Sequence, residues 1–348
     1  MNNDDLYPQP QRWTEFDKRE FPEQRWRIQG LVPVEGFCIL AAPSGEKKTW
    51  IAMAIAKNVA DGTDFLNNAE FKTTPSNVLY VDQEMPQTEL QRRGRLLGLN
   101  KSSKAIWVLN HGVVNLNETL QVDQLLAFIE ENEIGVVIVD TLRAIAGGLD
   151  ENKAEEVRAF FNQFKELKDK GVSVIFLDHC RKPQQYEGKK PKKEQLFASQ
   201  DKLASVEVLM MVKSESGSND IFVYPLKNRS GLERKPFKVC MREDDNTLSL
   251  VYDGDIEDDL NKKEEAKDMI LEVLGDGGQT TTELIVLAKA QRNIGEKNVR
   301  EALKELVIDG AITEGRKGRA NYYQLGAADQ QNNTDRTNEL PSDLFGSA

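Results

Sequence analysis

The chain has 348 residues, a formal net charge of -11 at pH 7, three cysteines and two histidines. Single hydrophobic cores stop growing near about 250 to 300 residues, so one large domain and a smaller one are expected. The acidic balance excludes a protein that coats nucleic acid with its whole surface. No cysteine spacing indicates a disulfide framework or a zinc site, and no segment approaches the roughly 18 apolar residues that cross a bilayer. We therefore expect a soluble, cytoplasmic protein without a membrane partner.

Short apolar runs alternate with helical periodicity in the first two thirds of the chain. Four runs are expected as buried strands, at 36–41, 77–81, 135–139 and 172–177. The segment 154–170 carries apolar residues at helical spacing. Strands that alternate with helices predict an α/β fold with a mainly parallel, doubly wound sheet. The runs at 221–226, 237–241 and 247–252 are expected as antiparallel hairpins that complete this sheet.

The composition changes after the last of these runs. Residues 254–263 are acidic and almost free of apolar side chains, so they are expected as a linker between a domain at 20–253 and a second at 264–325. The second domain has the order of a winged helix-turn-helix, with three helices followed by a two-stranded tail. Residues 1–19 are expected as a polar lead-in and 326–348 as a disordered tail.

The segment after the first predicted strand has the order strand, loop, helix that a phosphate-binding loop requires. It reads Ala42, Pro43, Ser44, Gly45, Glu46, Lys47, Lys48 and Thr49, and Trp50 follows in the helix. A phosphate chain needs backbone N–H groups at a helix amino terminus, a lysine for the β and γ oxygens, and a hydroxyl on magnesium. Lys48 and Thr49 supply the last two groups. Residues 43–50 are therefore the predicted ATP site, and an ordinary lysine-rich turn is the alternative.

The loop departs from the pattern G-x-x-x-x-G-K-[ST] at both glycine positions. Ala42 replaces the first glycine and Lys47 replaces the second. A side chain at position 47 costs little if φ is negative, but about 1 kcal/mol or more if the backbone is left-handed. This substitution puts the rate of hydrolysis in question.

Other predicted strands also end in polar side chains. The second ends near Glu84, the third at Asp140 and the fourth near His179. Ligands bind at the carboxyl edge of such sheets, so these side chains are expected beside the phosphate loop. Glu84 is the candidate base that polarises water, and Asp140 is expected to hold the magnesium shell with Thr49. His179 is the candidate sensor of the γ-phosphate. The alternatives are a solvated loop glutamate and a histidine that is only hydrogen-bonded.

Two groups of cations follow the fourth strand. The first lies in the next loop, where in a ring of subunits it would face the central hole and grip a phosphodiester backbone. It comprises Lys189, Lys190, Lys192 and Lys193. The second group, Lys227 and Arg229, ends a hairpin strand. Arg229 is expected as an arginine finger on a neighbour's γ-phosphate, with Lys227 as its partner. A solvated charge run and an exposed hairpin turn are the alternatives.

As a set, these segments resemble the RepA-type hexameric replicative helicases of plasmids and phages, a RecA-like group related to the DnaB helicases and to the RadA and KaiC ATPases. The likeness covers roughly residues 20–255 and rests on A-P-S-G-E-K-K-T, Y-V-D-Q-E-M, V-V-I-V-D-T, the turn Asp150-Glu151-Asn152, D-H-C-R-K and L-K-N-R-S-G. It implies a RecA-like P-loop ATPase core and a homo-hexamer that uses ATP and Mg²⁺ to move along single-stranded DNA. It also implies a site shared between neighbouring subunits, with the same roles for Lys48, Thr49, Glu84, Asp140, His179 and Arg229. The family usually has glycine in place of Lys47.

The carboxy-terminal winged helix resembles a module that binds DNA or a protein partner. Arg316, Lys317 and Arg319 lie in its predicted wing and are candidate DNA contacts. The tail residues 342–345 loosely resemble a peptide that binds a sliding clamp. A primase or an initiator is the other partner left open.

Three functions remain as alternatives. The first is an ATP-dependent DNA helicase or translocase in the replication of a plasmid, phage or other mobile element. The second is an ATP-binding, DNA-binding regulator or initiation factor with weak or no hydrolysis, which Lys47 and the winged helix favour. The third is a recombinase-like strand-pairing ATPase that forms filaments.

Overall fold

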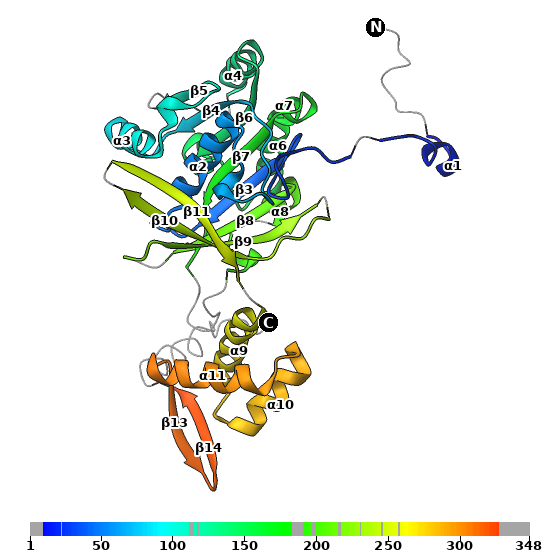
Figure 1. Ribbon diagram of the computed structural model, residues 1–348. Coiled ribbons are helices and arrows are strands. Elements are labelled where there is room, and N and C mark those ends of the chain that lie inside the picture. The colour runs from blue at the N-terminus through cyan, green and yellow to red at the C-terminus, as the bar shows by residue number, and fades with distance from the viewer. Residues whose placement is uncertain are drawn as a thin grey trace, which may run out of the picture.

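The computed structural model describes residues 10–326, apart from 22, 111–114, 117, 183–190, 197–199, 215–216, 230, 245 and 257. It has a large α/β body and a smaller carboxy-terminal unit, whereas α1 (Trp13–Phe16) stands apart at the end of an extended segment (Figure 1). Within this described part, no helix is both long and apolar enough to cross a membrane.

A nine-stranded sheet forms the centre of the body, in the order β11-β10-β9-β8-β3-β7-β6-β4-β5. The strands from β8 to β5 in this order are parallel, and β9, β10 and β11 continue the sheet in antiparallel pairing. Their bounds are β3 (Phe37–Ala42), β4 (Asn77–Asp82), β5 (Ile106–Asn110), β6 (Ile134–Asp140), β7 (Ser173–His179), β8 (Val208–Ser214), β9 (Asp220–Asn228), β10 (Phe237–Asp244) and β11 (Thr247–Asp255). The predicted fold class, an α/β fold whose sheet is mainly parallel and ends in antiparallel hairpins, is confirmed.

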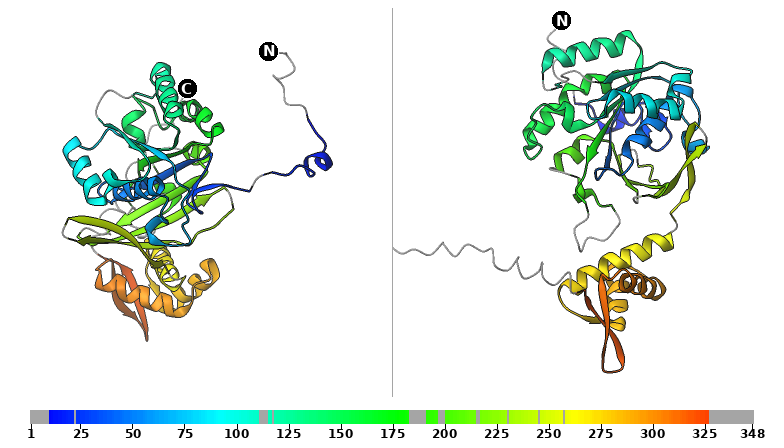
Figure 2. Two further views of the ribbon diagram at one scale, coloured as in Figure 1. Left: turned by 45° about the horizontal axis from the view of Figure 1, so that its top comes forward. Right: turned by 90° about the vertical axis from the view of Figure 1, so that its left-hand side faces the viewer.

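Helices cover both faces of this sheet (Figures 1 and 2). One face carries α2 (Lys48–Asp61) and α3 (Gln87–Leu97), and the other carries α4 (Thr119–Glu131), α5 (Leu142–Ile145), α6 (Ala154–Gln163), α7 (Lys165–Asp169) and α8 (Gln200–Ser205). Alternate residues of each parallel strand enter opposite cores, as Cys38 and Leu40 do on the α2 face and Ile39 and Ala41 on the other. A strand buried on both faces has little room for polar residues except at its ends.

The central strands therefore become polar only where they leave the sheet. β4 ends at Asp82, β6 at Asp140 and β7 at His179. The parallel register places Asp82 beside Asp140, and His179 beside Ala42 at the end of β3. The carboxyl edge of the sheet thus gathers these side chains around the loop that follows β3.

Some predicted elements have different bounds in the structure. The single helix expected at 154–170 is two helices, because the chain turns at Phe164, whose φ is -94° and ψ is 3°. This turn buries Phe164 against Phe160 and Phe176, with ring centroids 5.2 and 5.7 Å apart respectively. Smaller elements are β1 (Trp26–Ile28), β2 (Val32–Pro33), η2 (Phe65–Asn67), η3 (Leu99–Lys101) and η4 (Lys193–Gln195).

The carboxy-terminal unit contains α9 (Asp258–Gly275), α10 (Thr281–Arg292) and α11 (Glu296–Ile308), with a sheet of β12 (Gln279–Thr280), β13 (Ile312–Lys317) and β14 (Ala320–Leu325). Its hydrophobic cluster draws only on residues between Ala266 and Leu325. Thr280 and Glu283 form a capping box at the start of α10. The unit thus has three helices followed by the hairpin of β13 and β14, with β12 paired to β14.

The linker expected at 254–263 is not an irregular segment throughout. β11 continues to Asp255 and α9 already begins at Asp258. Acidic residues suit the first turn of a helix, so the acidic composition that indicated a linker is equally compatible with a helix start. Residues 1–9 of the expected lead-in and 327–348 of the expected tail lie outside the described residues.

Candidate nucleotide site

The loop after β3 connects the middle of the sheet to the amino terminus of α2. β3 lies between β7 and β8 and ends at Ala42, and α2 begins at Lys48. Within the described residues no side chain caps α2. The first N–H groups of a helix have no partner inside it, so this end offers donors to an anion.

Lys47 has left-handed backbone, with φ 61° and ψ 15°. A residue with a Cβ in this region costs about 1 to 2 kcal/mol, so the departure from glycine is of the costly kind. Its ammonium donates to the carbonyl of Ser218, and the neighbouring Glu46 carboxylate accepts from the backbone N–H of Ser214. These contacts tie the loop to the end of β8 and to Ser218, just before β9. Gly45, at φ 85°, supplies the other left-handed turn.

A cavity of about 350 Å³ opens beside this loop. It brings together the loop and the polar ends of three strands or their following turns, as the sequence predicts. Its lining is Ser44, Gly45, Glu46, Lys47, Lys48, Thr49, Trp50, Glu84, Met85, Pro86, Glu89, Arg93, Asp140 and His179. Of the predicted ATP-site residues, only Pro43 is outside this lining.

Asp140 lies at the floor of the cavity and is 2 % exposed. Its Oδ2 accepts hydrogen bonds from Thr49 Oγ1 at 2.8 Å and from the Tyr80 hydroxyl at 3.2 Å. Burial raises the pKa of Asp140 to about 6, although Lys48 and the Thr49 hydrogen bond act in the opposite direction. Burial thus favours the protonated form of this carboxyl group, whereas the nearby ammonium and hydroxyl favour the ionised form.

The second oxygen of Asp140 is a candidate ligand for magnesium. Oδ1 is buried and has no hydrogen-bond partner among the described residues. Buried polar atoms of this kind are rare unless an ion or water completes their contacts. Together with the Thr49 hydroxyl, this oxygen gives the hard oxygen ligands that Mg²⁺ prefers, and bound phosphates and waters ordinarily complete its shell.

Glu84 projects from a turn that Asp82 fixes. Asp82 Oδ1 accepts from the backbone N–H groups of Glu84 and Met85, each at 2.8 Å. The amide of Asn110 donates to the carbonyls of Asp82 and Met85. The Glu84 side chain is 51 % exposed, and its Oε1 lies 3.5 Å from Nε2 of His179. A carboxylate and an imidazole therefore face each other across the cavity.

Residues on α3 border the same cavity and were not predicted from the sequence. The guanidinium of Arg93 lies 4.9 Å from the centre of the Trp50 ring. Glu89 holds Arg93 through a 2.7 Å hydrogen bond and also binds Arg92. The hydrogen bond from Arg92 has the largest effect and that from Arg93 the next largest, and together they lower the pKa of Glu89 to about 2. The sequence did contain a signal for these ion pairs, because Arg92 and Arg93 follow Glu89 by three and four residues, the spacing at which side chains meet on a helix.

Lys227 and Arg229 lie away from this cavity. β9 runs antiparallel to β8, and Asn228 pairs with Val208, which in turn pairs with Cys38. The distance along β3 from there to the phosphate loop is about 13 Å at about 3.3 Å per residue. Lys227 Nζ donates to the carbonyls of Leu203 and Val206, and Arg229 donates to that of Ala204. Burial and then Arg229 lower the pKa of Lys227 to about 8.

The candidate DNA-binding cations occupy two places. Lys189 and Lys190 fall outside the described residues, whereas Lys193 is exposed at η4 and Lys192 Nζ lies 3.8 Å from Asp268 of α9. Arg316, Lys317 and Arg319, which the sequence predicts in a wing, are exposed. Arg316 and Lys317 belong to β13, and Arg319 to the turn before β14.

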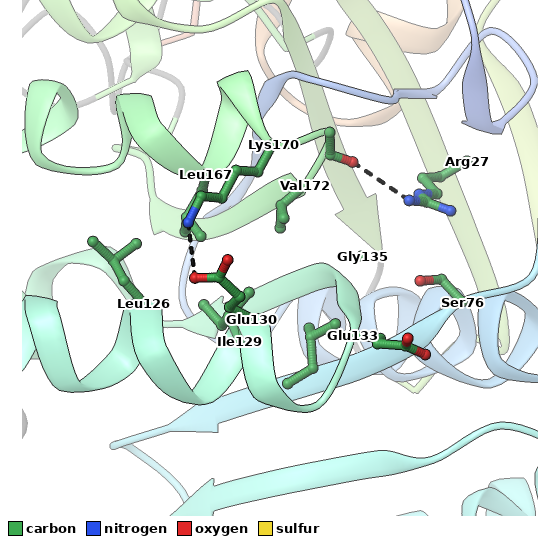
Figure 3. A pocket seen from close by; sticks show the side chains of 12 residues that line it. Arg27, Ser76, Leu126, Ile129, Glu130, Glu133, Gly135, Leu167, Lys170 and Val172 are labelled. Carbon is green, nitrogen blue, oxygen red and sulfur yellow. Dashed lines mark hydrogen bonds and ion pairs between the residues drawn. The ribbon is translucent and has the colours of Figure 1, made fainter. Parts of the chain in front are cut away.

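A further cavity, of about 430 Å³, lies at the opposite edge of the sheet (Figure 3). It is bordered by Arg27, by the start of β6 at Ile134 and by the turn at Gly171. Lys170 spans part of it through a 2.9 Å contact with Glu130. None of the predicted site residues that the structure describes lines this cavity, so the candidate site is the one beside the phosphate loop.

Comparison with known proteins identifies a family and similar solved structures. The family model described as AAA domain matches residues 4–185, which is more than half of the chain. A structure described as a DnaB-like replicative helicase and its interactions with primase aligns with a TM-score of 0.49 and 14% sequence identity. This alignment covers 68% of the present chain and 66% of the helicase chain, just under two thirds of the latter.

Proposed function

Because this chain belongs to the AAA domain family, we propose that it is an ATP-dependent DNA helicase or translocase, acting in the replication of a plasmid, phage or other mobile element. The observation that carries the proposal is the convergence of Lys48, Thr49, Glu84, Asp140 and His179 on one cavity beside a helix amino terminus. These are the groups that phosphoryl transfer from ATP requires: a cationic and amide cradle, a metal-holding carboxylate and a water-orienting base.

Each residue has a role that its contacts support. Lys48 is buried at the start of α2, where its ammonium serves the β and γ oxygens of ATP. Thr49 and Asp140 would hold Mg²⁺, which when bound would supply positive charge beside the phosphates. Glu84 orients water and accepts its proton, because its turn is fixed while its carboxylate stays accessible. His179 senses the γ-phosphate from the end of β7.

Trp50 and Arg93 give the cavity a flat wall. An indole ring under a guanidinium plane is a surface on which a nucleobase stacks. We assign this wall to the adenine of ATP.

Lys227 and Arg229 serve the nucleotide of a neighbouring subunit. They are at the sheet edge opposite their own phosphate loop, and the antiparallel register of β9 keeps them there. A finger at this place has a use only in an oligomer, so the proposal includes a homo-oligomer, a hexamer in the form that the helicase resemblance implies.

The DNA track is assigned to Lys189, Lys190, Lys192 and Lys193. The exposed wing residues Arg316, Lys317 and Arg319 provide a second contact, to duplex DNA or to a protein. A primase, an initiator or a sliding clamp is the proposed class of protein partner, and the cytoplasm the proposed compartment.

DNA-stimulated hydrolysis tests the leading proposal. We expect ATP hydrolysis to rise with single-stranded DNA, forked duplexes to be unwound, and both activities to disappear in Lys48→Ala. A hexamer that hydrolyses ATP equally with and without DNA, and never opens a fork, would contradict a motor function.

The second candidate is an ATP-binding regulator or initiation factor with slow hydrolysis. Left-handed Lys47 and its bond to Ser218 favour it, because both hold the phosphate loop in one conformation. Lys47→Gly separates the candidates. A large gain in turnover would mark the natural chain as a slow nucleotide binder, and unchanged turnover supports the motor.

A further inference from the structure

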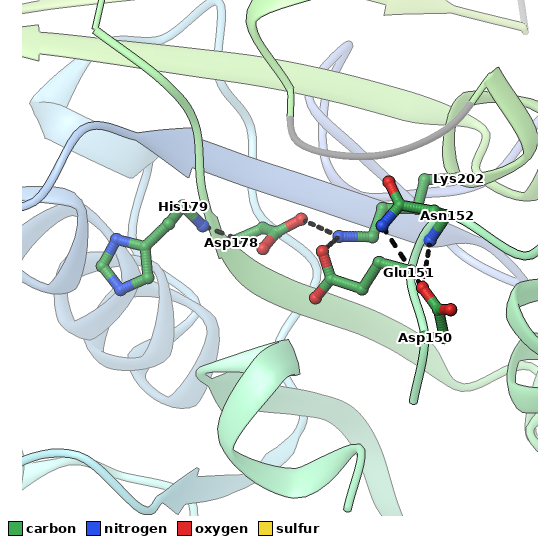
Figure 4. Close-up of polar contacts among 6 residues, drawn as sticks. All are labelled: Asp150, Glu151, Asn152, Asp178, His179 and Lys202. Carbon is green, nitrogen blue, oxygen red and sulfur yellow. Dashed lines mark hydrogen bonds and ion pairs between the residues drawn. The ribbon is translucent and has the colours of Figure 1, made fainter. Parts of the chain in front are cut away.

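A lysine with no exposed surface is bonded to the residue that precedes His179, which lines the candidate nucleotide cavity (Figure 4). Lys202 of α8 is 0% exposed, and its ammonium lies 2.8 Å from both Asp178 Oδ2 and Glu151 Oε2. The three side chains come from α8, the end of β7 and the turn before α6. Removing such charges from water is costly, and only close, well-directed partners make it tolerable. Lys202 therefore fixes α8 against the sheet.

On one side this cluster touches the proposed sensor. Asp178 directly precedes His179, and its Oδ1 accepts the backbone N–H of His179 at 2.8 Å. Asp178 also pairs with Ala41 in β3, next to the start of the phosphate loop. The same carboxylate thus holds Lys202 with one oxygen and the backbone of the sensor with the other.

On the other side, the carboxy-terminal end of α8 holds the proposed finger. The carbonyl of Ala204 accepts from Arg229, and those of Leu203 and Val206 accept from Lys227. The last carbonyls of a helix lack intrahelical partners and favour cations. Lys227 and Arg229 are therefore placed by α8, which is placed in turn by Lys202.

We propose that Lys202 is a positioning residue for the arginine finger: it anchors α8, and through the α8 carbonyls sets where Lys227 and Arg229 meet the nucleotide of the adjoining subunit. This inference rests on the proposed shared ATP site. Within one subunit, the ion pair of Lys202 and Asp178 would then position both His179 in its own ATP site and the finger that enters the site of the next subunit.

Mixed rings of two inactive variants test it. Lys48→Ala subunits retain the finger but not the phosphate-gripping lysine, and Arg229→Ala subunits retain the cavity but not the finger. Mixing them restores hydrolysis wherever the intact cavity of an Arg229→Ala subunit meets the intact finger of a Lys48→Ala subunit. Lys202→Met is then added either to the finger-donating subunit or to the nucleotide-binding subunit.

We expect restored hydrolysis to fall by about a hundredfold when Lys202→Met is in the finger donor, because a misplacement of about 1 Å costs that much. The loss is expected to be several times smaller when it is in the nucleotide-binding subunit. An equal loss in both positions, or a loss only in the nucleotide-binding subunit, would overturn the inference. If the parent mixture shows no restored hydrolysis, the shared site itself is wrong.

Asp201→Asn is the matched control. Asp201 lies on the same helix but faces Arg158 of α6 at 3.8 Å, and its replacement is expected to leave the restored rate within about twofold of the parent mixture. If Lys202→Met does not assemble, Lys202→Met with Glu151→Gln removes one charge of each sign. That pair is judged by the same donor-against-acceptor comparison, after circular dichroism confirms folding.

Discussion

The variants Lys47→Gly and Lys47→Ala together test the backbone of the phosphate loop in solution. Both remove the ammonium that bonds to the Ser218 carbonyl, so only the backbone preference differs between them. A Cβ at φ 61° costs about 1 to 2 kcal/mol, whereas glycine has no such cost but loses about 0.5 to 1 kcal/mol more entropy on folding. The glycine variant is therefore expected to be more stable than the alanine variant by about 1 kcal/mol.

When either variant is compared with the natural chain, the loss of the hydrogen bond from Lys47 to Ser218 also contributes. This loss is expected to cost about 1 kcal/mol. Lys47→Ala should therefore be about 1 kcal/mol less stable than the natural protein, whereas in Lys47→Gly the relief of strain offsets the lost bond. Equilibrium urea unfolding without nucleotide, followed by circular dichroism, gives the midpoints at a common slope.

Glu35 offers a matched pair elsewhere in the chain. It is exposed, has φ 65°, and bonds to Arg25, a contact that Glu35→Gly and Glu35→Ala both remove. The same gap of about 1 kcal/mol is expected there. Coincident midpoints for the Lys47 pair, alongside the expected gap for the Glu35 pair, would refute a left-handed Lys47.

Three further predictions concern catalysis. Burial lowers the pKa of Lys227 to about 8, so this lysine loses its charge as the pH rises through that value. DNA-stimulated hydrolysis should therefore fall between about pH 7 and about pH 9. Lys227→Arg should flatten this dependence of the steady-state hydrolysis rate on pH. Asp82→Ala frees the turn that carries Glu84 and should lower kcat by about tenfold without changing binding of a fluorescent ATP analogue, whereas Asp82→Asn, which keeps an acceptor oxygen, should lose less. Arg93→Ala leaves Trp50 uncovered and should raise the KM for ATP by about threefold at unchanged kcat, and an unchanged KM would remove Arg93 from the base-binding wall.

The core of the candidate site could be predicted because its signals are local. Apolar runs that end in Glu84, Asp140 and His179 indicate strands, and a parallel sheet places the ends of its strands at one edge. The loop at Lys48 and Thr49 identifies that edge as the phosphate side. No contact between distant segments has to be known for this inference.

Other parts of the site depend on contacts between segments far apart in the chain. The stacking of Arg93 on Trp50 and the bond from Tyr80 to Asp140 arise only when α2, α3 and the sheet have packed. The strands β5 and β8 were not predicted, although β8 joins the parallel part of the sheet to its antiparallel part. The burial of Lys202 was equally hidden, because a lysine in a polar segment ordinarily indicates solvent.

The separate cluster of the carboxy-terminal unit bears on how such a chain can evolve. Since its apolar cluster lies between Ala266 and Leu325, and those of the body extend no further than Ile256, a crossover just after Ile256 would leave both interiors whole. Gene fusion at that point could join a different carboxy-terminal unit to the same α/β body without opening a void in either one. The α/β body and the carboxy-terminal unit could then be inherited independently of each other.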